Sequence, residues 1–186
     1  MRRQFFAAGL SVCLAVLTLF SFAGCGKREY ELLEKNECHR VVLESSEDYQ
    51  ENHAKSLIEY EKEMLRFKTS DGGYADNFGG SFVDSNGIYT ICIVGSQTLS
   101  ESEYVNYKKV AVSFNSLNDI YGALIQLIGE YTIWDMHICE ICNKVQVCVE
   151  DEKQIDLIIQ RLKTDRLFKR NSLLFYVGRK EIDKLD

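Results

Sequence analysis

The chain has 186 residues and a net charge of −6 at neutral pH, with 28 acidic and 22 basic side chains. An acidic chain without a cluster of lysines and arginines is not expected to bind nucleic acid. It also lacks the basic patch that holds a protein on an anionic membrane surface. Its length fits one domain with an ordinary core, and the absence of proline fits a domain without a rigid linker.

The N-terminal residues have the organisation of an export signal. Arg2 and Arg3 supply positive charge, and residues 5–20 form an uncharged, mostly apolar run. This run is shorter than the roughly 20 residues that a membrane-spanning helix needs, and it is typical of a signal-peptide core. We therefore expect residues 1–24 to be a signal peptide.

The segment Phe22-Ala23-Gly24-Cys25 resembles the lipobox of bacterial lipoproteins, with Phe22 where that family usually has leucine. The resemblance implies cleavage before Cys25 and a diacylglycerol on its thiol. The mature protein would then be anchored in the cell membrane, facing outside the cytoplasm. An ordinary signal peptide and an uncleaved anchor helix are the alternatives, and the arginine pair faintly resembles a twin-arginine signal.

The first part of the mature chain is expected to be a tether followed by a helix. Residues 25–45 are charged and weakly periodic, with a short strand or turn expected near 41–43. A helix capped by Ser45 or Ser46 is predicted to extend to Lys68, because its apolar residues recur at helical spacing. A glycine-rich segment then ends it.

Two β-hairpins are predicted. Strands over 80–83 and 88–94 flank an Asn-Gly turn, which is the strongest short hairpin signal. The second of these strands is apolar on both faces, so we expect it to be central. Another hairpin is predicted to join strands over 133–139 and 145–150.

Further helices and strands are predicted from apolar residues at helical or alternating spacing. In chain order they are a strand over 110–114, a helix from an Asn115 or Ser116 cap to Tyr131, a helix opened by Asp151, and a strand over 173–177. Residues 46–178 are thus expected to form one domain, and 179–186 a polar tail.

This order of elements predicts an α+β fold. We expect a mainly antiparallel sheet built from the two hairpins, with the helices packed on it. The two halves have a similar order, a helix, a hairpin, then a helix and a strand, which suggests a loose internal duplication.

Residues 74–84, followed by the Asn-Gly turn and an apolar strand, resemble the opening of small secreted clostridial domains. Those domains are similar to the pro-regions of α-lytic-type serine proteases. Residues 112–114 and 143–147 are similar to the second half of that pattern, and the resemblance spans about 48–177. The chain includes no protease domain, so the resemblance implies a fold and a protein-binding surface on the sheet.

No catalytic or cofactor-binding motif stands out. The glycine pairs at 72–73 and 79–80 lack the Lys-Ser/Thr and the helix start that a phosphate loop requires. The histidines at 39, 53 and 137 are not accompanied by a Gly-x-Ser-x-Gly elbow. We therefore expect a protein that is not an enzyme and carries no cofactor.

Cysteine is the unusual feature. Cys13 leaves with the signal peptide and Cys25 carries the lipid. The remaining cysteines are Cys38, Cys92, Cys139, Cys142 and Cys148. An odd number in an oxidising compartment leaves at least one cysteine outside any disulfide.

The second hairpin carries His137, Cys139, Cys142 and Cys148, which suggests a zinc site or a redox pair. Structural zinc ligands normally come as two pairs in loops, and a redox Cys-x-x-Cys normally opens a helix. Neither pattern is present. Disulfides or buried thiols are therefore favoured, and His137, Cys139 and Cys142 stay weak metal candidates.

The pleat limits the register of this hairpin. Three apolar side chains of each strand are expected on the core face: Trp134, Met136, Ile138, and Val145, Val147, Val149. The core-facing residues have even numbers on the first strand and odd numbers on the second. Two directly opposed residues must therefore have numbers whose sum is odd. Three tight registers satisfy this rule, and they oppose Cys139 with Cys148, Gln146 or Lys144. We favour the first, with its turn at Asn143-Lys144, because asparagine tolerates positive φ. It allows a Cys139–Cys148 disulfide.

These observations predict an extracytoplasmic lipoprotein, held to the membrane through the diacylglycerol on Cys25. The domain is expected to be a protein-binding or structural module whose partner is another exported protein. The alternative is a thiol-disulfide or metal-binding protein that uses Cys139, Cys142 and Cys148.

Overall fold

The computed structural model describes residues 30–33, 47–96 and 102–178. Within these ranges the chain forms three helices and seven strands in two mixed sheets, so the predicted α+β class is confirmed. None of the helices in this part of the chain is long and apolar enough to cross a membrane. The predicted signal peptide, Cys25 and the tail over 179–186 lie outside the described residues.

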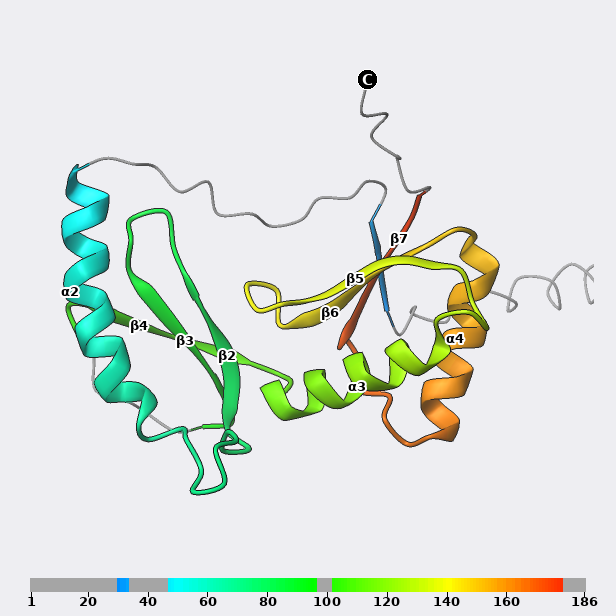
Figure 1. Ribbon diagram of the computed structural model, residues 1–186, viewed down its shortest axis with the longest axis horizontal. Coiled ribbons are helices and arrows are strands. Elements are labelled where there is room, and N and C mark those ends of the chain that lie inside the picture. The colour runs from blue at the N-terminus through cyan, green and yellow to red at the C-terminus, as the bar shows by residue number, and fades with distance from the viewer. Residues whose placement is uncertain (1–29, 34–46, 97–101, 179–186) are drawn as a thin grey trace, which may run out of the picture.

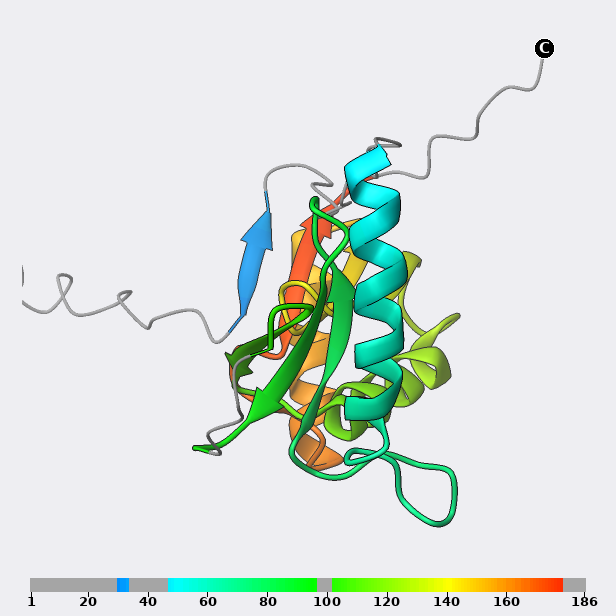
Figure 2. The same ribbon diagram turned by 90° about the vertical axis from the view of Figure 1, so that its left-hand side faces the viewer.

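The first half of the fold is one helix on a three-stranded sheet. It contains α2 (Glu47–Met64), β2 (Phe78–Val83), β3 (Tyr89–Val94) and β4 (Val105–Val110). β2 and β3 are antiparallel, β3 and β4 are parallel, and β3 is central, as its apolar sequence predicted. Figure 1 and Figure 2 show α2 lying along one face of this sheet. The core beneath it consists of Met64, Phe67, Phe78, Ile91, Ile93 and Val105.

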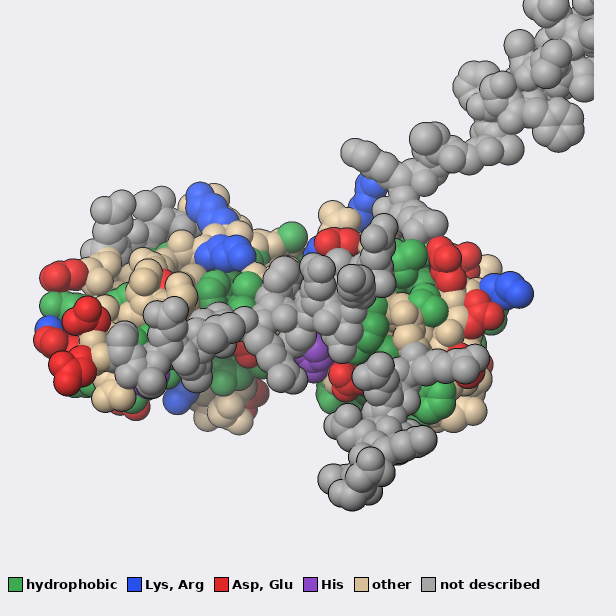
Figure 3. Space-filling view, turned by 90° about the horizontal axis from the view of Figure 1, so that it is seen from above, with side chains coloured by type: hydrophobic (Ala, Val, Ile, Leu, Met, Phe, Trp, Pro, Cys, Tyr) green, Lys and Arg blue, Asp and Glu red, His purple; other side chains and the backbone are tan. Residues whose placement is uncertain are grey.

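The outer face of α2 is charged. Lys55 pairs with Glu51 one turn away, and Lys62 pairs with Glu59. Figure 3 shows acidic side chains gathered at this end of the molecule. Exposed pairs of this kind add little stability, so α2 is held mainly by its inner face.

The second half of the fold is a four-stranded sheet with two helices. It contains α3 (Phe114–Leu127), β5 (Ile133–Cys139), β6 (Lys144–Val149), α4 (Glu152–Thr164) and β7 (Leu173–Val177), and it is joined by β1 (Glu31–Leu33). The sheet order is β1-β7-β6-β5. Side chains of α3 and α4 form one core with Val145, Val147 and Val149 of β6. Both helices therefore lie on the same face of this sheet (Figure 1).

The strands lie in two mixed sheets rather than in the one mainly antiparallel sheet that was expected. Both predicted hairpins are present. However, β4 runs parallel to β3, and β7 runs parallel to β6 and to β1. The physical reason is the connection: a long crossover returns the chain to the starting end of the sheet, and the next strand then runs parallel.

The two halves of the fold have a similar topology. In each half a helix leads into an antiparallel hairpin, and the next strand pairs parallel with the second hairpin strand. The strand orders β2-β3-β4 and β5-β6-β7 therefore correspond. The crossover contains α4 in the second half, whereas no helix is described between β3 and β4.

The predicted boundaries are wrong around α3. The strand lies at Val105–Val110 rather than over 110–114, and α3 begins at Phe114. Its cap is Ser113, whose hydroxyl accepts the N–H of Ser116, and not Asn115 or Ser116. Phe114 looked like a strand residue because it is apolar, but it packs on the rings of Tyr74 and Phe78 in the first half.

Part of the expected tether belongs to the fold. β1 pairs in parallel with β7, with Leu32 opposite Phe175. Tyr30 packs edge to face on Phe175, with ring centroids 5.5 Å apart. The strand or turn expected near 41–43 and the caps expected at Ser45 or Ser46 lie outside the described residues.

A β-bulge changes the core face of β5. Ile133 pairs with Val149 and Asp135 pairs with Cys148, so Trp134 is an extra residue on the β5 side. Met136 and Ile138 pack on the core as expected, together with Ile133. Trp134, predicted on the core face, is 37% exposed because the bulge interrupts the alternation.

Asn143 joins the two halves. Its backbone has a φ of 54°, and its side chain is buried. The side-chain amide donates to the carbonyls of Gly79 (3.1 Å) and Val112 (2.8 Å), and its oxygen accepts the N–H of Val112 at 2.9 Å. Gly79 lies in β2 and Val112 in the link from β4 to α3. One side chain at the β5–β6 turn therefore satisfies backbone groups from the first half.

We expect Asn143→Gly to lower the free energy of unfolding by about 3 kcal/mol, because buried backbone groups lose their partners. Glycine keeps the positive φ, so the loss reports the side-chain hydrogen bonds alone. Asn171, exposed with a φ of 63°, is the matched control. Urea unfolding should show little or no loss for Asn171→Gly. Equal unfolding energies for the two variants would contradict the role of the Asn143 side chain.

Candidate functional site

The candidate residues that fall within the described part of the chain lie on the β5–β6 hairpin. Cys139 and Cys148 belong to β5 and β6, His137 also lies on β5, and Cys142 lies in the turn. Cys25 and Cys38 lie outside the described residues.

The register opposes Cys139 with Lys144 and Cys148 with Asp135. This is the four-residue loop over 140–143, one of the three registers that alternation allowed, but not the favoured one. Cys139 and the residue opposite Cys148 lie four positions apart on β5, which corresponds to about 13 Å along a strand. The predicted Cys139–Cys148 disulfide is therefore wrong. The cysteines in the described part of the chain are thiols.

The physical reason is the contact of the turn with the first half of the fold. A two-residue turn at Asn143-Lys144 would place Asn143 at its first position. In the structure Asn143 is the last residue of a longer loop, whose Asn143 N–H donates to the Glu140 carbonyl at 3.3 Å. Positive φ at Asn143 was anticipated, but its tertiary partners Gly79 and Val112 were not.

Cys139 and Cys142 lie together in this turn. The Cys142 thiol donates to the Cys139 carbonyl at 3.5 Å. A hydrogen bond with the Cys139 side chain raises the pKa of Cys142, and burial raises it further, while nearby Lys144 acts in the opposite direction. Cys139 is 6% exposed, whereas Cys142 is only partly buried.

Cys92 and Cys148 have separate environments. Cys92 lies on β3 with its thiol 3.9 Å from the Glu140 carbonyl, and burial raises its pKa to about 11. Cys148 lies beside Tyr176 and Gly178, and burial raises its pKa as well. A raised pKa lowers the fraction of reactive thiolate, so both thiols are expected to react slowly at neutral pH.

The metal hypothesis gains no support from this geometry. His137 lies opposite Gln146 in the register, and Cys148 lies toward the far end of β6 from the turn. Among the residues described by the structure, no group of three or more His, Cys, Asp or Glu side chains could hold a metal ion.

Glu140 holds the turn to the first sheet. Its carboxylate accepts the N–H of Ser81 in β2, and Lys108 of β4 donates to the Ile141 carbonyl at 2.7 Å. Burial raises the pKa of Glu140, while the bond from Ser81 acts in the opposite direction. No pattern in the sequence singled out Glu140, because its partner lies 59 residues away.

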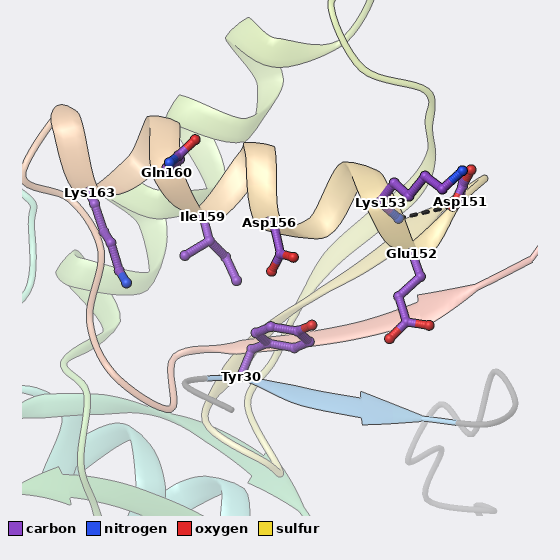
Figure 4. A pocket seen from close by; sticks show the side chains of 8 residues that line it. All are labelled: Tyr30, Asp151, Glu152, Lys153, Asp156, Ile159, Gln160 and Lys163. Carbon is purple, nitrogen blue, oxygen red and sulfur yellow. Dashed lines mark hydrogen bonds between the residues drawn. The ribbon is translucent and has the colours of Figure 1, made fainter. Parts of the chain in front are cut away.

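A groove of about 780 Å³ runs between α4 and Tyr30. Figure 4 shows Glu152, Asp156 and Ile159 directed from α4 toward Tyr30. Five of the eight lining side chains are charged: Asp151, Glu152, Lys153, Asp156 and Lys163. Helical spacing could have placed residues 152, 156 and 159 on one face. The position of Tyr30 opposite them could not be inferred, because residues 25–45 were interpreted as a tether.

No protein-family model matches the chain, and no curated protein is significantly similar to it in sequence.

Glu140→Gln should change how stability depends on pH. Burial raises the folded-state pKa above the ordinary value of 4.5. The contribution of Glu140 is therefore fully present below pH 4.5 and is lost as pH rises through the folded-state pKa. Glutamine can still accept from Ser81 but does not ionise.

Unfolding free energies of wild type and Glu140→Gln, measured by urea titration from pH 4 to 8, test this. The variant should gain relative to the wild type as pH rises, and the difference should then level off. A difference that is constant over this range would show that the buried carboxylate does not titrate with folding.

Proposed function

We propose that this chain is an extracytoplasmic lipoprotein, anchored through a diacylglycerol on Cys25, whose α+β domain binds another exported protein. The charged n-region, the apolar run over 5–20 and the lipobox-like segment ending at Cys25 support the anchor. Only residues 26–30 separate Cys25 from β1. This length spans roughly 20 Å at most, so the anchor would keep the second sheet close to the membrane.

The groove between α4 and Tyr30 is the observation that carries the binding proposal. Ligand sites for small molecules are mostly apolar and enclose the ligand. This groove is open, and charged side chains of both signs predominate in its lining. Such a lining suits a polar polypeptide segment, with the acidic side chains at the start of α4 facing basic groups of the partner.

Edge strand β1 borders the same groove. Within the described residues β1 is an edge strand of its sheet: one of its edges pairs with β7, and no strand pairs with the other. An extended partner segment could add to such an edge through main-chain hydrogen bonds while its side chains enter the groove. The resemblance of residues 48–177 to secreted pro-regions supports the same class of function, although it implied a surface on the sheet.

The anchor is tested by Cys25→Ser. In a bacterial host the wild-type chain should partition into the detergent phase as a processed, lipid-modified protein. The variant should be released into the medium or accumulate as a precursor, because serine cannot form the thioether. A Cys25→Ser variant that remains processed and lipid-modified would overturn the anchor.

The binding site is tested by photo-crosslinking on intact cells of the producing organism. A photoreactive residue at Asp156, inside the groove, should yield one discrete adduct with an exported protein. The same residue at Glu61, exposed on the charged face of α2, is the control. No adduct from Asp156, or the same adduct from both positions, would contradict a binding site in the groove.

A further inference from the structure

The β5–β6 turn brings two thiols together outside the groove. Cys139 ends β5, and Cys142 follows within the loop over 140–143. The sulfur of Cys142 lies 3.5 Å from the Cys139 carbonyl oxygen, so its side chain folds back over Cys139.

The geometry of the turn suits a disulfide between these residues. A disulfide needs Cα atoms about 4.4–6.8 Å apart. The Cys142 sulfur lies 3.5 Å from the Cys139 carbonyl oxygen, so the two residues are close enough for the side chains to meet within one turn. The turn is also held from outside. Asn143 bonds to Gly79 and Val112, Glu140 accepts from Ser81, and Lys108 donates to the Ile141 carbonyl.

We propose that Cys139 and Cys142 form a reversible disulfide within the β5–β6 turn by exchange with the disulfide of an exported protein or a small thiol compound. The exposure of the two side chains sets the order of the steps. Cys142 is partly exposed and can meet an external disulfide, whereas Cys139 is buried behind it in the same turn.

The exchange balances as two displacements. The Cys142 thiolate attacks one sulfur of the external disulfide, so a mixed disulfide forms and one thiol leaves. The Cys139 thiolate then attacks the Cys142 sulfur and expels the second thiol. The protein loses two electrons and two protons, and the external disulfide gains them as two thiols.

The raised pKa of Cys142 limits the rate of this reaction. Only the thiolate attacks, and the hydrogen bond with Cys139 keeps Cys142 protonated. Oxidation should therefore be slow at neutral pH and faster as pH rises. This is the behaviour of a slow, reversible redox site rather than of a fast catalyst of exchange.

The test uses the full-length chain, purified in detergent and equilibrated with glutathione buffers of increasing oxidised fraction. Acid quenching, alkylation and trypsin digestion follow. Cys139 and Cys142 share the tryptic peptide over 110–144, which holds no other cysteine, and Cys92 and Cys148 lie on other peptides. The peptide should change from a doubly alkylated form to an unalkylated form two hydrogens lighter than the dithiol.

Two variants complete the test. Cys148→Ser should leave this transition unchanged, because Cys148 lies away from the turn. Cys142→Ser should abolish the lighter peptide. The proposal is overturned if the wild-type peptide stays doubly alkylated at the highest oxidised fraction, if it carries glutathione on both cysteines, or if it is linked to the Cys92 peptide.

Discussion

The contact between the two halves of the fold depends on the side chain of Asn143. Its amide and oxygen bond to Gly79 in β2 and to both backbone groups of Val112 in the β4–α3 link. These groups lie where the first sheet ends and the second half begins, and they are buried. Leaving them without partners costs more than a hydrogen bond contributes. The position of the β5–β6 turn on the first sheet is therefore set by the hydrogen bonds that buried backbone groups need, as well as by apolar packing.

The same constraint explains the register of the hairpin. Alternation of Val145, Val147 and Val149 left three registers open, and the tolerance of asparagine for positive φ favoured a two-residue turn at Asn143-Lys144. The structure takes the longest loop, because that loop places Glu140 beside Ser81 while Asn143 meets Gly79. The register therefore depends on residues 59 and 64 positions away in the sequence. No local sequence pattern could have predicted it.

The parts of the fold that followed from sequence are those set by local chemistry. The Asn-Gly turn, the apolar β3 and the helical stripe of α4 were found in their places. The errors arise where tertiary contacts decide. Phe114 begins a helix because Ser113 caps that helix and because the Phe114 ring packs on aromatic rings of the first half. Trp134 leaves the core face because of a bulge that its own sequence does not mark. Parallel pairing of β4 and β7 likewise follows from crossovers and not from strand composition.

Strand β6 connects the two features for which a function is proposed. It begins at Lys144, directly after the turn of Cys142 and Asn143, and ends at Val149, just before Asp151 caps α4 beside the groove. Its length of six residues corresponds to about 20 Å. Val145, Val147 and Val149 are fully buried, so the strand is held rigidly along this distance. We therefore expect a change of thiol state at the turn to leave the groove in place, because the strand between them is close-packed in the core. The proposed binding at α4 and the proposed thiol chemistry at Cys139 and Cys142 would therefore be separable, and the Cys142→Ser variant should form the same crosslink from Asp156 as the wild type.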